Sequence, residues 1–491
     1  MIPWTLRQVA AAVGGKLHQV PDPEQLVTAP LEHDSRKVVP GGLFLAVPGE
    51  RTDGRSHAAA AHAAGAVATL SSDPLDVPTV VLGAGPYPTG PQESRRLALA
   101  ALAALAKANA QALVARGLTV VGITGSSGKT STKDLVTQVL ATRGATVGPP
   151  GSFNNELGHP WTVLRADQDT RFLVLELAAR TIGHIAELAQ IAQPRIGVVL
   201  GVGSAHLGVF GSRENIAIAK GELVEALPCA DDGGVAVLNA DDPLVSAMAS
   251  RTRARVVRYG MAESADVRAA DVRLDPLSRA SFTLITPQGD APVTLRVHGE
   301  HQAHNALAAA AVAAECGLSP AQTAEALSAA QAASPRRMQV AERADGVVVV
   351  NDSYNANPES MRAGLRALVG MAHQCGGASW AVLGQMGELG DDSIVLHDQL
   401  GRFVVRLSVD RLVVVGDSRS AKALHTGAVL EGSWSGEAVL VPDWQSAARL
   451  VAAELGPRDV VLVKASQSEG LWQVAEALLE PRPSDAAGSG L

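Results

Sequence analysis

Aromatic residues are scarce in this chain of 491 residues, since Phe, Trp and Tyr together make up only 3% of it. Proteins that bind single-stranded nucleic acid stack bases on aromatic side chains, and most nucleic-acid-binding proteins carry excess positive charge. The formal net charge here is −8. Composition therefore argues against binding of nucleic acid, and we expect any bound nucleotide to be a small ligand.

Cysteine is also rare. The chain has three cysteines, Cys229, Cys316 and Cys375, which are far apart and include no C-x-x-C pair. An odd number at such spacing supports neither a disulfide framework nor a cysteine zinc site. Free thiols in a reducing cytoplasm are the expected state.

Long hydrophobic runs are missing as well. The N-terminus has neither the basic region nor the apolar region of a signal peptide. The most apolar stretch, residues 97–106, is rich in alanine and is interrupted by Lys107 and Asn109, which makes it too short to span a bilayer. We expect a cytoplasmic protein that does not insert into a membrane.

One stretch of the chain is rich in glycine and has the order of a phosphate-binding loop. Residues 120–133 read Val-Val-Gly-Ile-Thr-Gly-Ser-Ser-Gly-Lys-Thr-Ser-Thr-Lys, the order of a strand, a glycine-rich loop and a helix start. Backbone N–H groups of such a loop surround a polyphosphate, Lys129 can reach the terminal phosphates, and Thr130 can ligate Mg²⁺. We predict an ATP site formed by Gly125, Ser126, Ser127, Gly128, Lys129, Thr130 and Ser131.

The glycine spacing differs from the general phosphate-loop pattern. A strict G-x-x-x-x-G-K-[ST] motif requires glycine at Ile123, whereas the chain has glycine at 122, 125 and 128. An ordinary glycine-rich turn between a strand and a helix is the alternative. The Gly-Lys-Thr sequence directly after a β-branched run favours the phosphate loop.

Periodicity divides the chain into three α/β domains. We predict a small N-terminal α/β domain at 1–115, with a capped helix from Thr5, a strand at 43–47 and helices at 57–64 and 93–115. A central phosphate-loop domain with a parallel sheet follows at 116–332, with strands at 120–124, 172–177, 196–200 and 235–238 and a hairpin within 282–297. A Rossmann-like domain at 333–480 has strands at 347–350, 381–383, 412–415 and 460–463. The tail, 481–491, is predicted to be disordered.

Polar side chains follow several central strands, at the edge of the sheet where ligands bind in open α/β folds. Glu176 ends one apolar run, His206 follows a glycine-rich turn, and Lys220 lies in a helical pattern. A carboxylate and an imidazole near a polyphosphate suggest magnesium rather than zinc, because no thiolate accompanies them. The alternatives are a solvated strand end, a hydrogen-bonded turn histidine and a surface lysine.

Two further loops are rich in polar groups. Residues 351–358, Asn-Asp-Ser-Tyr-Asn-Ala-Asn-Pro, lie between an apolar strand and a helix, and they either cap that helix or meet a ligand. In the first domain Asp34, Ser35 and Arg36 stand together. The arginine can bind a diphosphate with two hydrogen bonds, although a salt bridge within the turn explains the same tripeptide.

Taken together, these stretches resemble the Mur ligase family of peptidoglycan synthesis over nearly the whole chain. General family features are the phosphate loop, Glu176, Gly203-Ser204-Ala205-His206, Lys220-Gly221-Glu222 and residues 299–305. Three motifs are similar to the branch that adds a dipeptide, namely residues 152–158, 351–361 and 383–390. The resemblance implies an ATP-dependent amide ligase that joins two small molecules, D-alanyl-D-alanine and a UDP-N-acetylmuramoyl tripeptide, through an acyl phosphate. It implies no nucleic-acid partner.

The resemblance also implies roles for single residues. The first domain would hold the UDP end of the substrate with Ser35, Arg36 and Asp53. Asn154 and Asn155 would lie near the acceptor, Asn305, Arg337 and Asp352 near ATP, and Asn355 and Asn357 on the dipeptide side. Lys129, His206 and Lys220 would be catalytic. Thr130 and Glu176 would hold one Mg²⁺, and His206 with a carbamoylated Lys220 would hold a second.

Three places in the chain depart from the family pattern, at four residues. His301-Gln302 stands where His-Asn is usual, and Lys464-Ala465-Ser466-Gln467 stands where Lys-Gly-Ser-Arg is usual. The latter change affects a contact to phosphate or dipeptide. Arg55 replaces a common histidine, and we expect little consequence from that replacement.

Two alternative functions stay open. One is a sister ligase that adds an amino acid to a muramoyl or folate-type acceptor, and the other is a binding module in which ATP only sets the angle between domains. We expect a monomer. The sequence does not indicate whether the third residue of the tripeptide is lysine, diaminopimelate or another diamine.

Overall fold

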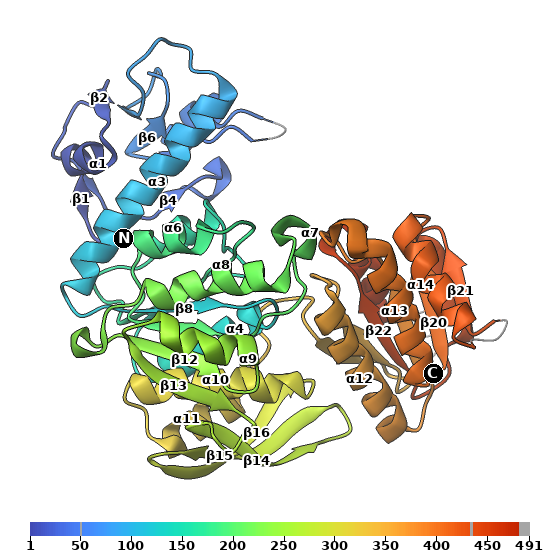
Figure 1. Ribbon diagram of the computed structural model, residues 1–491. Coiled ribbons are helices and arrows are strands. Elements are labelled where there is room, and N and C mark those ends of the chain that lie inside the picture. The colour runs from blue at the N-terminus through green and yellow to red at the C-terminus, as the bar shows by residue number, and fades with distance from the viewer. Residues whose placement is uncertain (50–51, 433–435, 481–491) are drawn as a thin grey trace, which may run out of the picture.

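The chain builds three β-sheets one after another, and Figure 1 shows them as three bodies running from blue through green and yellow to red. The computed structural model describes residues 1–49, 52–432 and 436–480. The predicted disordered tail, 481–491, lies outside the described residues. The predicted fold class, α/β with parallel sheets in three domains, is confirmed. The domain limits at 115, 332 and 480 stay predictions.

The N-terminal sheet has five strands in the order β2-β7-β6-β5-β4, parallel except for β2. The strands are β2 (Lys16–His18), β4 (Leu31–Glu32), β5 (Leu43–Leu45), β6 (Ala68–Ser71) and β7 (Thr79–Val81). A two-stranded ribbon, β1 (Trp4–Thr5) with β3 (Leu26–Val27), leads into α1 (Leu6–Val13). The predicted capping box is present, because the Thr5 side chain accepts a hydrogen bond from the Gln8 backbone N–H.

Helix α3 (Pro91–Val114) connects the first sheet to the second and is longer than its apolar centre suggested. Its 24 residues make it long and apolar enough to cross a membrane by length and composition. The prediction that this stretch is too short to span a bilayer was therefore wrong. One face of the helix packs into the core through Ala98, Ala101, Leu102, Leu105, Ala106, Ala110 and Leu113. A buried core helix of this kind passes the same test, so α3 is weak evidence for a membrane.

The central sheet has nine strands in the order β16-β15-β14-β13-β12-β11-β8-β10-β9. Its parallel strands are β8 (Thr119–Thr124), β9 (Thr146–Val147), β10 (Phe172–Glu176), β11 (Ile196–Val199), β12 (Val235–Asn239) and β13 (Arg255–Gly260). An antiparallel extension follows with β14 (Val267–Leu274), β15 (Arg279–Thr286) and β16 (Gly289–His298). The four predicted parallel strands and the predicted hairpin at the sheet edge are confirmed.

Helices cover both faces of the central sheet. They are α4 (Lys129–Ala141), α5 (Gly158–Val163), α6 (His184–Ile191), α7 (Leu207–Phe210), α8 (Arg213–Glu225), α9 (Pro243–Ser246), α10 (His301–Glu315) and α11 (Pro320–Ala329). In α10 the alanines at 303, 306 and 308–311 are all nearly or fully buried. Because alanine side chains are short, α10 lies close to the antiparallel strands and to α4, and its N-terminal turn therefore reaches the phosphate loop.

The C-terminal sheet has six strands in the order β17-β18-β22-β19-β20-β21, parallel except for β17. The strands are β17 (Gln339–Glu342), β18 (Val348–Asn351), β19 (Ser379–Leu383), β20 (Arg411–Val415), β21 (Ala438–Val441) and β22 (Val460–Lys464). Helices α12 (Pro358–Cys375), α13 (Ser393–Arg406), α14 (Arg419–Leu430), α15 (Trp444–Glu454) and α16 (Trp472–Leu479) complete it. The four predicted strands of this part are confirmed.

The second and third sheets meet at the carboxyl ends of their strands. Helix α7 of the central part packs on η5 (Gly390–Asp392), a short 3₁₀ helix of the C-terminal part. A Cβ at Gly208 would lie 2.4 Å from the Gly390 backbone nitrogen, so glycine at 208 permits this close approach. Ser204 also donates to Glu359, at the start of α12. The loops that follow the strands of both sheets consequently face each other.

Candidate active site between the central and C-terminal sheets

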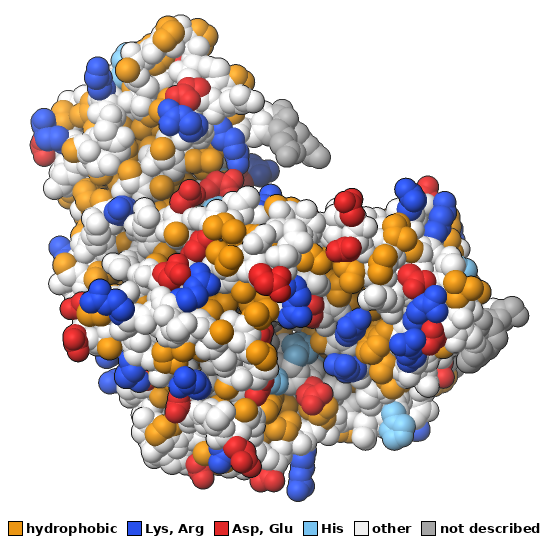
Figure 2. Space-filling view, viewed as in Figure 1, with side chains coloured by type: hydrophobic (Ala, Val, Ile, Leu, Met, Phe, Trp, Pro, Cys, Tyr) orange, Lys and Arg blue, Asp and Glu red, His pale blue; other side chains and the backbone are white. Residues whose placement is uncertain are grey.

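A cleft of about 830 Å³ lies where the loops of the second and third sheets face each other. Fifteen of the predicted site residues line it: Ser126, Ser127, Gly128, Lys129, Thr130, Ser131, Asn154, Asn155, Glu176, His206, Asn305, Arg337, Asp352, Asn355 and Asn357. Gly125, Lys220, Ser35, Arg36 and Asp53 are not among the lining residues. On the face of the molecule in Figure 2, acidic and basic side chains alternate over the surface.

The phosphate loop has the conformation that its glycines permit. Gly128 has a φ of +80°, and a Cβ there would lie 2.7 Å from Asn305 Oδ1, so both backbone angle and space require glycine. Helix α4 starts at Lys129 with no side-chain cap. Its first N–H groups are therefore left for an anion, as in other helix N-termini that bind phosphate. Lys129 Nζ donates to the Gly125 carbonyl at 2.7 Å.

Ser126 helps to hold the neighbouring turn rather than pointing free into the cleft. Its hydroxyl accepts a hydrogen bond from the Gly203 N–H at 2.9 Å, and its N–H donates to the Gly201 carbonyl at 3.0 Å. From the third sheet, the Asn357 amide donates to the Ser126 carbonyl at 3.5 Å. The phosphate loop is thereby linked to the turn that carries His206.

Glu176 lies at the end of β10, beside the phosphate loop. The carboxylate is buried and accepts hydrogen bonds from the Thr130 hydroxyl at 2.8 Å and the Asn154 amide at 2.7 Å. Carboxylate and hydroxyl oxygens are the donors that Mg²⁺ prefers. The described part of the chain contains no group of three or more His, Cys, Asp and Glu side chains that could hold a metal by themselves. This donor set fits an ion that takes its remaining ligands from phosphate and water.

His206 and Lys220 lie near enough to Lys129 for its charge to act on both of them. His206 Nδ1 contacts the Glu388 carboxylate of the third sheet. Burial lowers the pKa of His206, although the Glu388 carboxylate acts against this. Lys220, on α8, is only 4% exposed, and its amine has no hydrogen bond or ion pair with any described residue. Burial, together with the charge of Lys129, holds the pKa of Lys220 well below its usual range.

Asn305 is fixed by its neighbours on two elements. Its Oδ1 accepts from the Thr132 hydroxyl at 3.1 Å, and its Nδ2 donates to Gln302 Oε1 at 2.8 Å. The departure at Gln302 therefore has a structural role, because the glutamine carbonyl orients the Asn305 amide. The two residues that differ at the second place, Ala465 and Gln467, have different surroundings. Ala465 is fully buried in the C-terminal core, whereas Gln467 lines the cleft.

Asp352 is held from two sides. Lys464 Nζ donates to Asp352 Oδ2 at 2.6 Å, and the Met338 N–H donates to Oδ1 at 3.0 Å. Arg337 lies next to Met338, and its guanidinium stacks on the Tyr354 ring at 4.2 Å from the ring centroid. Sequence reasoning assigned no role to Tyr354, Glu388, His301 or Lys464, although all four line the cleft. Each of them lies inside a sequence motif described above, and that position was the only indication in the sequence that they could belong to the site.

The three residues expected at the UDP end lie in turns of the N-terminal part, outside its strands. Ser35 and Arg36 belong to the 3₁₀ helix η1 (Ser35–Lys37), and Arg36 pairs with Asp34 at 2.9 Å while its side chain stays 87% exposed. The hydrogen bonds from Arg36 lower the pKa of Asp34 to about 2. The salt bridge within the turn, the alternative reading of this tripeptide, is present in the structure.

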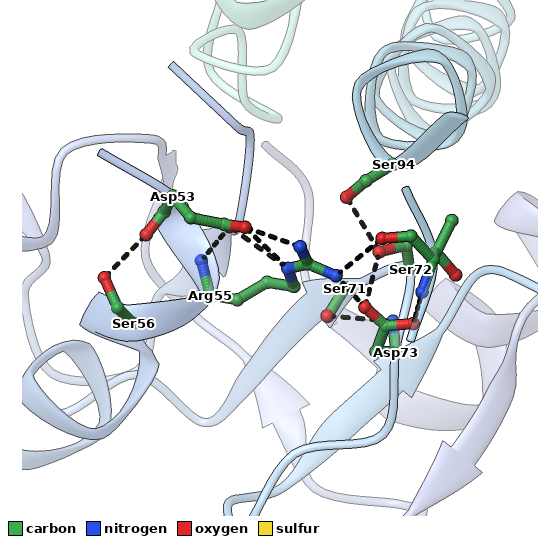
Figure 3. Close-up of polar contacts among 8 residues, drawn as sticks. Asp53, Arg55, Ser56, Ser71, Ser72, Asp73 and Ser94 are labelled. Carbon is green, nitrogen blue, oxygen red and sulfur yellow. Dashed lines mark hydrogen bonds and ion pairs between the residues drawn. The ribbon is translucent and has the colours of Figure 1, made fainter. Parts of the chain in front are cut away.

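Asp53 is joined to Arg55, and Figure 3 shows the network around them. Arg55 donates to Asp53 at 2.5 Å, contacts Asp73 through its other terminal nitrogen, and donates to the Thr89 carbonyl at 3.1 Å. Asp73 in turn accepts from the Thr89 N–H at 2.7 Å. Arg55 thus joins the Asp53 turn to the end of β6, and that the replacement has little consequence stays a prediction.

Comparison with known proteins agrees with the resemblance. Three family models match the chain: "Mur ligase family, catalytic domain" over residues 30–107, "Mur ligase middle domain" over 123–313 and "Mur ligase, glutamate ligase domain" over 336–467. The UDP-N-acetylmuramoyl-tripeptide–D-alanyl-D-alanine ligase of Mycobacterium tuberculosis is 55% identical, over 100% of this chain and 99% of that protein.

Solved structures show the same likeness. The crystal structure of MurF from Acinetobacter baumannii has a TM-score of 0.83 and 30% identity, and the match covers 98% of this chain and 99% of that one. MurF from Thermotoga maritima in complex with ADP has a TM-score of 0.77 and 28% identity, over 94% of this chain and 99% of that one. From the matched family models and the full-length similarity, the chain belongs to the Mur ligase family.

Proposed function

We propose that this chain joins D-alanyl-D-alanine to a UDP-N-acetylmuramoyl tripeptide at the expense of ATP, giving the UDP-muramoyl pentapeptide precursor of peptidoglycan. The observation that carries the proposal is the 55% identity, over essentially both full chains, to a ligase named for this reaction. The cleft supports it, because Lys129, the Glu176 carboxylate and the amide-rich loop of the third sheet line one space. The product would serve cell-wall biogenesis.

The reaction needs ATP because a carboxylate is a poor acyl donor. The C-terminal carboxylate of the tripeptide attacks the γ-phosphorus of ATP, and ADP leaves, which produces an acyl phosphate. The free amine of D-alanyl-D-alanine then attacks the acyl carbon, loses a proton, and expels inorganic phosphate through a tetrahedral intermediate. Lys129 and the N–H groups at the start of α4 stabilise the charge on the phosphoryl oxygens. Closely facing loops exclude water from the acyl phosphate.

Bound magnesium would supply Lewis-acid stabilisation of the phosphoryl charge. We propose that Thr130 and Glu176 hold one ion and that His206 and a modified Lys220 hold a second. A lysine amine that stays neutral can add CO₂ to form a carbamate and release a proton. The lowered pKa of Lys220 and its lack of a partner among the described side chains favour this modification. The carbamate would replace a cation that repels Mg²⁺ by a carboxylate-like ligand.

The substrates would extend from the cleft toward the N-terminal sheet. We propose that Asn305, Arg337 and Asp352 contact the nucleotide, and that Asn154 and Asn155 lie at the acceptor end. Asn355 and Asn357 would lie on the dipeptide side, although Asn357 also caps α12. Ser35, Arg36 and Asp53 would contact the UDP end. A monomer in the cytoplasm, without insertion into the membrane, completes the proposal.

Release of phosphate tests the function. The purified chain is incubated with ATP, Mg²⁺, the UDP-muramoyl tripeptide and D-alanyl-D-alanine, and each component is omitted in turn. We expect release only when all four are present, together with a pentapeptide product detected by mass. Release with single amino acids but not with the dipeptide would point to a sister ligase. Absence of release under every condition would point to a nucleotide-gated binding module.

A further inference from the structure

The loop at residues 149–158, between β9 and α5, contacts all three parts of the chain. The Pro149 carbonyl accepts a hydrogen bond from Lys133 of α4 at 2.8 Å. The Phe153 ring packs on Trp161 with 5.1 Å between centroids, and the Trp161 indole donates to Glu32 of the N-terminal sheet at 3.3 Å. The loop is therefore fixed at one end by α4 and at its middle by Trp161 of α5, which is itself bonded to the N-terminal part. Glu156 of the loop also pairs with Arg95 of α3 at 3.5 Å.

The third part of the chain reaches the same loop through one side chain. Tyr354, between β18 and α12, places its hydroxyl on the Ser152 hydroxyl. The tyrosine is itself held in place, because Arg337 stacks on its ring and its N–H donates to the Arg336 carbonyl at 3.1 Å. Because the ring and the backbone of Tyr354 are both held, its hydroxyl can hold the Ser152 hydroxyl in one position.

Ser152 stands two residues before Asn154, whose amide donates to the Glu176 carboxylate. Glu176 also accepts from Thr130 at the start of α4. A short series of contacts thus runs from Tyr354 through the loop to the carboxylate beside the phosphate loop. The N–H of Ala178 donates to the Asn154 carbonyl at 3.4 Å, which ties the loop to the end of β10.

We propose that Tyr354 is a positioning residue for this site. Its hydroxyl, through Ser152, sets Asn154 against Glu176, so that the carboxylate is correctly oriented only while the loop of the third sheet is docked on the cleft. The kinetic test of this inference rests on the proposed function, because it measures ligation. Through the Tyr354–Ser152 contact, the position of the third sheet would control the orientation of Glu176.

A double-mutant cycle tests the contact. Tyr354→Phe and Ser152→Ala each remove one hydroxyl of the pair, so each is expected to lower kcat about tenfold, with the KM for both substrates little changed. Because both substitutions break the same contact, the double variant is expected to lose about tenfold and not about a hundredfold. A purely structural role would not produce this non-additivity together with unchanged KM values.

A second readout does not require turnover. Binding of Mn²⁺ to the chain in the presence of ADP, measured by electron paramagnetic resonance, is expected to weaken in Tyr354→Phe and in Ser152→Ala. Tyr87→Phe is the matched control for the tyrosine, because its hydroxyl donates to the Gly83 carbonyl far from the cleft. Ser250→Ala, whose hydroxyl donates to the Ala247 carbonyl on the surface, is the control for the serine.

Multiplying effects in the double variant, or Mn²⁺ binding equal to that of the controls, would overturn the proposal. Thermal unfolding of each variant shows whether it is folded, and the two single substitutions are independent tests of the same contact. A wild-type chain that ligates no substrate would refute the proposed function, while the Mn²⁺ measurement would still decide whether Tyr354 orients Glu176.

Discussion

Lys129 is the residue whose position most directly implies chemistry at the phosphate loop. Its amine donates to the Gly125 carbonyl, at the start of the loop, and burial lowers its pKa although Glu176 acts in the opposite direction. Lys129→Ala removes the cation that we propose stabilises the transferred phosphoryl group. We expect kcat to fall by roughly 10²–10³-fold or more, with the fold intact. Circular dichroism checks the fold, and substantial residual ligation would refute the assigned role.

Lys220 is expected to act only after modification. Lys220→Ala should abolish most of the activity, and short carboxylic acids such as formate or acetate should restore part of it by occupying the place of the carbamate. Rates measured over a range of acid concentrations provide the test. Arg7, an exposed side chain paired with Glu24, gives a matched control in Arg7→Ala, which no acid should affect. If no acid restores activity at any concentration, carbamoylation is the wrong explanation for this lysine.

Arg55 is expected to matter for stability. Its side chain is 18% exposed and pairs with two carboxylates, so Arg55→Gln leaves Asp53 and Asp73 without their cation. We expect a loss of about 3 kcal/mol, the lower end for breaking a buried ion pair. Arg96→Gln breaks an exposed pair with Glu93 and should cost about 0.5 kcal/mol or less. The first thermal transition of each variant measures the difference, and equal shifts would contradict the network.

The same network has a pH dependence with a definite sign. Hydrogen bonds from Arg55 lower the pKa of Asp53 in the folded chain. The stabilisation is therefore complete at neutral pH and is lost as the pH falls below the ordinary aspartate range, through the lowered pKa.

Among elements, the short helix α7 shows how a glycine lets the second and third sheets meet. A Cβ at Gly208 would overlap the backbone of Gly390, so Gly208→Ala is expected to separate α7 from η5 and to weaken the neighbouring contact between His206 and Glu388. We expect kcat to fall about tenfold, with little change in thermal unfolding, because the overlap is relieved between domains rather than inside a core.

Gly90→Ala is the control for that substitution. Its new methyl group would meet no atom within 4 Å, so its activity should equal that of the wild type. A Gly208→Ala variant with wild-type kcat would show that the approach of α7 to η5 is not needed for turnover.

Elements with strong local signals could be predicted from the sequence. β8, β10, β11 and β12 are continuous β-branched or aliphatic runs buried on both faces, and their pattern predicted them correctly. Two of the missed strands carry weaker signals. β9 has two residues, and β21 is a half-exposed edge strand. Their strand conformation depends on pairing with neighbours, which local sequence does not specify.

The site could be predicted in part for a similar reason. Thr130 and Glu176 stand at strand and helix ends, so the rule for ligand sites in parallel sheets located them. Tyr354 and Glu388 lie in loops more than 170 residues after Glu176 in the chain. Only the packing of the third sheet brings them to the cleft. The contact of Arg55 with Asp73 could not be predicted, because Asp73 lies just after β6 and nothing in the local sequence reveals the pairing.

In the whole molecule, the cleft and the residues expected to bind the UDP end belong to different parts of the chain. The loops of the second and third sheets enclose the cleft, while Ser35, Arg36 and Asp53 lie in turns of the N-terminal part and outside the lining of that cleft. A substrate that contacts both places must be long, as a nucleotide-linked sugar peptide is. The arrangement supports a reaction at one end of an extended substrate that is recognised at its other end.

Transfer of ¹⁸O from the substrate carboxylate to phosphate tests whether ligation passes through an acyl phosphate. The UDP-muramoyl tripeptide is labelled with ¹⁸O in both oxygens of its C-terminal carboxylate and incubated with ATP, Mg²⁺ and D-alanyl-D-alanine. We expect a pentapeptide that keeps one ¹⁸O in the new amide and inorganic phosphate that carries the other, because the bond between the acyl carbon and the bridging oxygen breaks. Released phosphate without ¹⁸O, or absence of the pentapeptide, would contradict this mechanism.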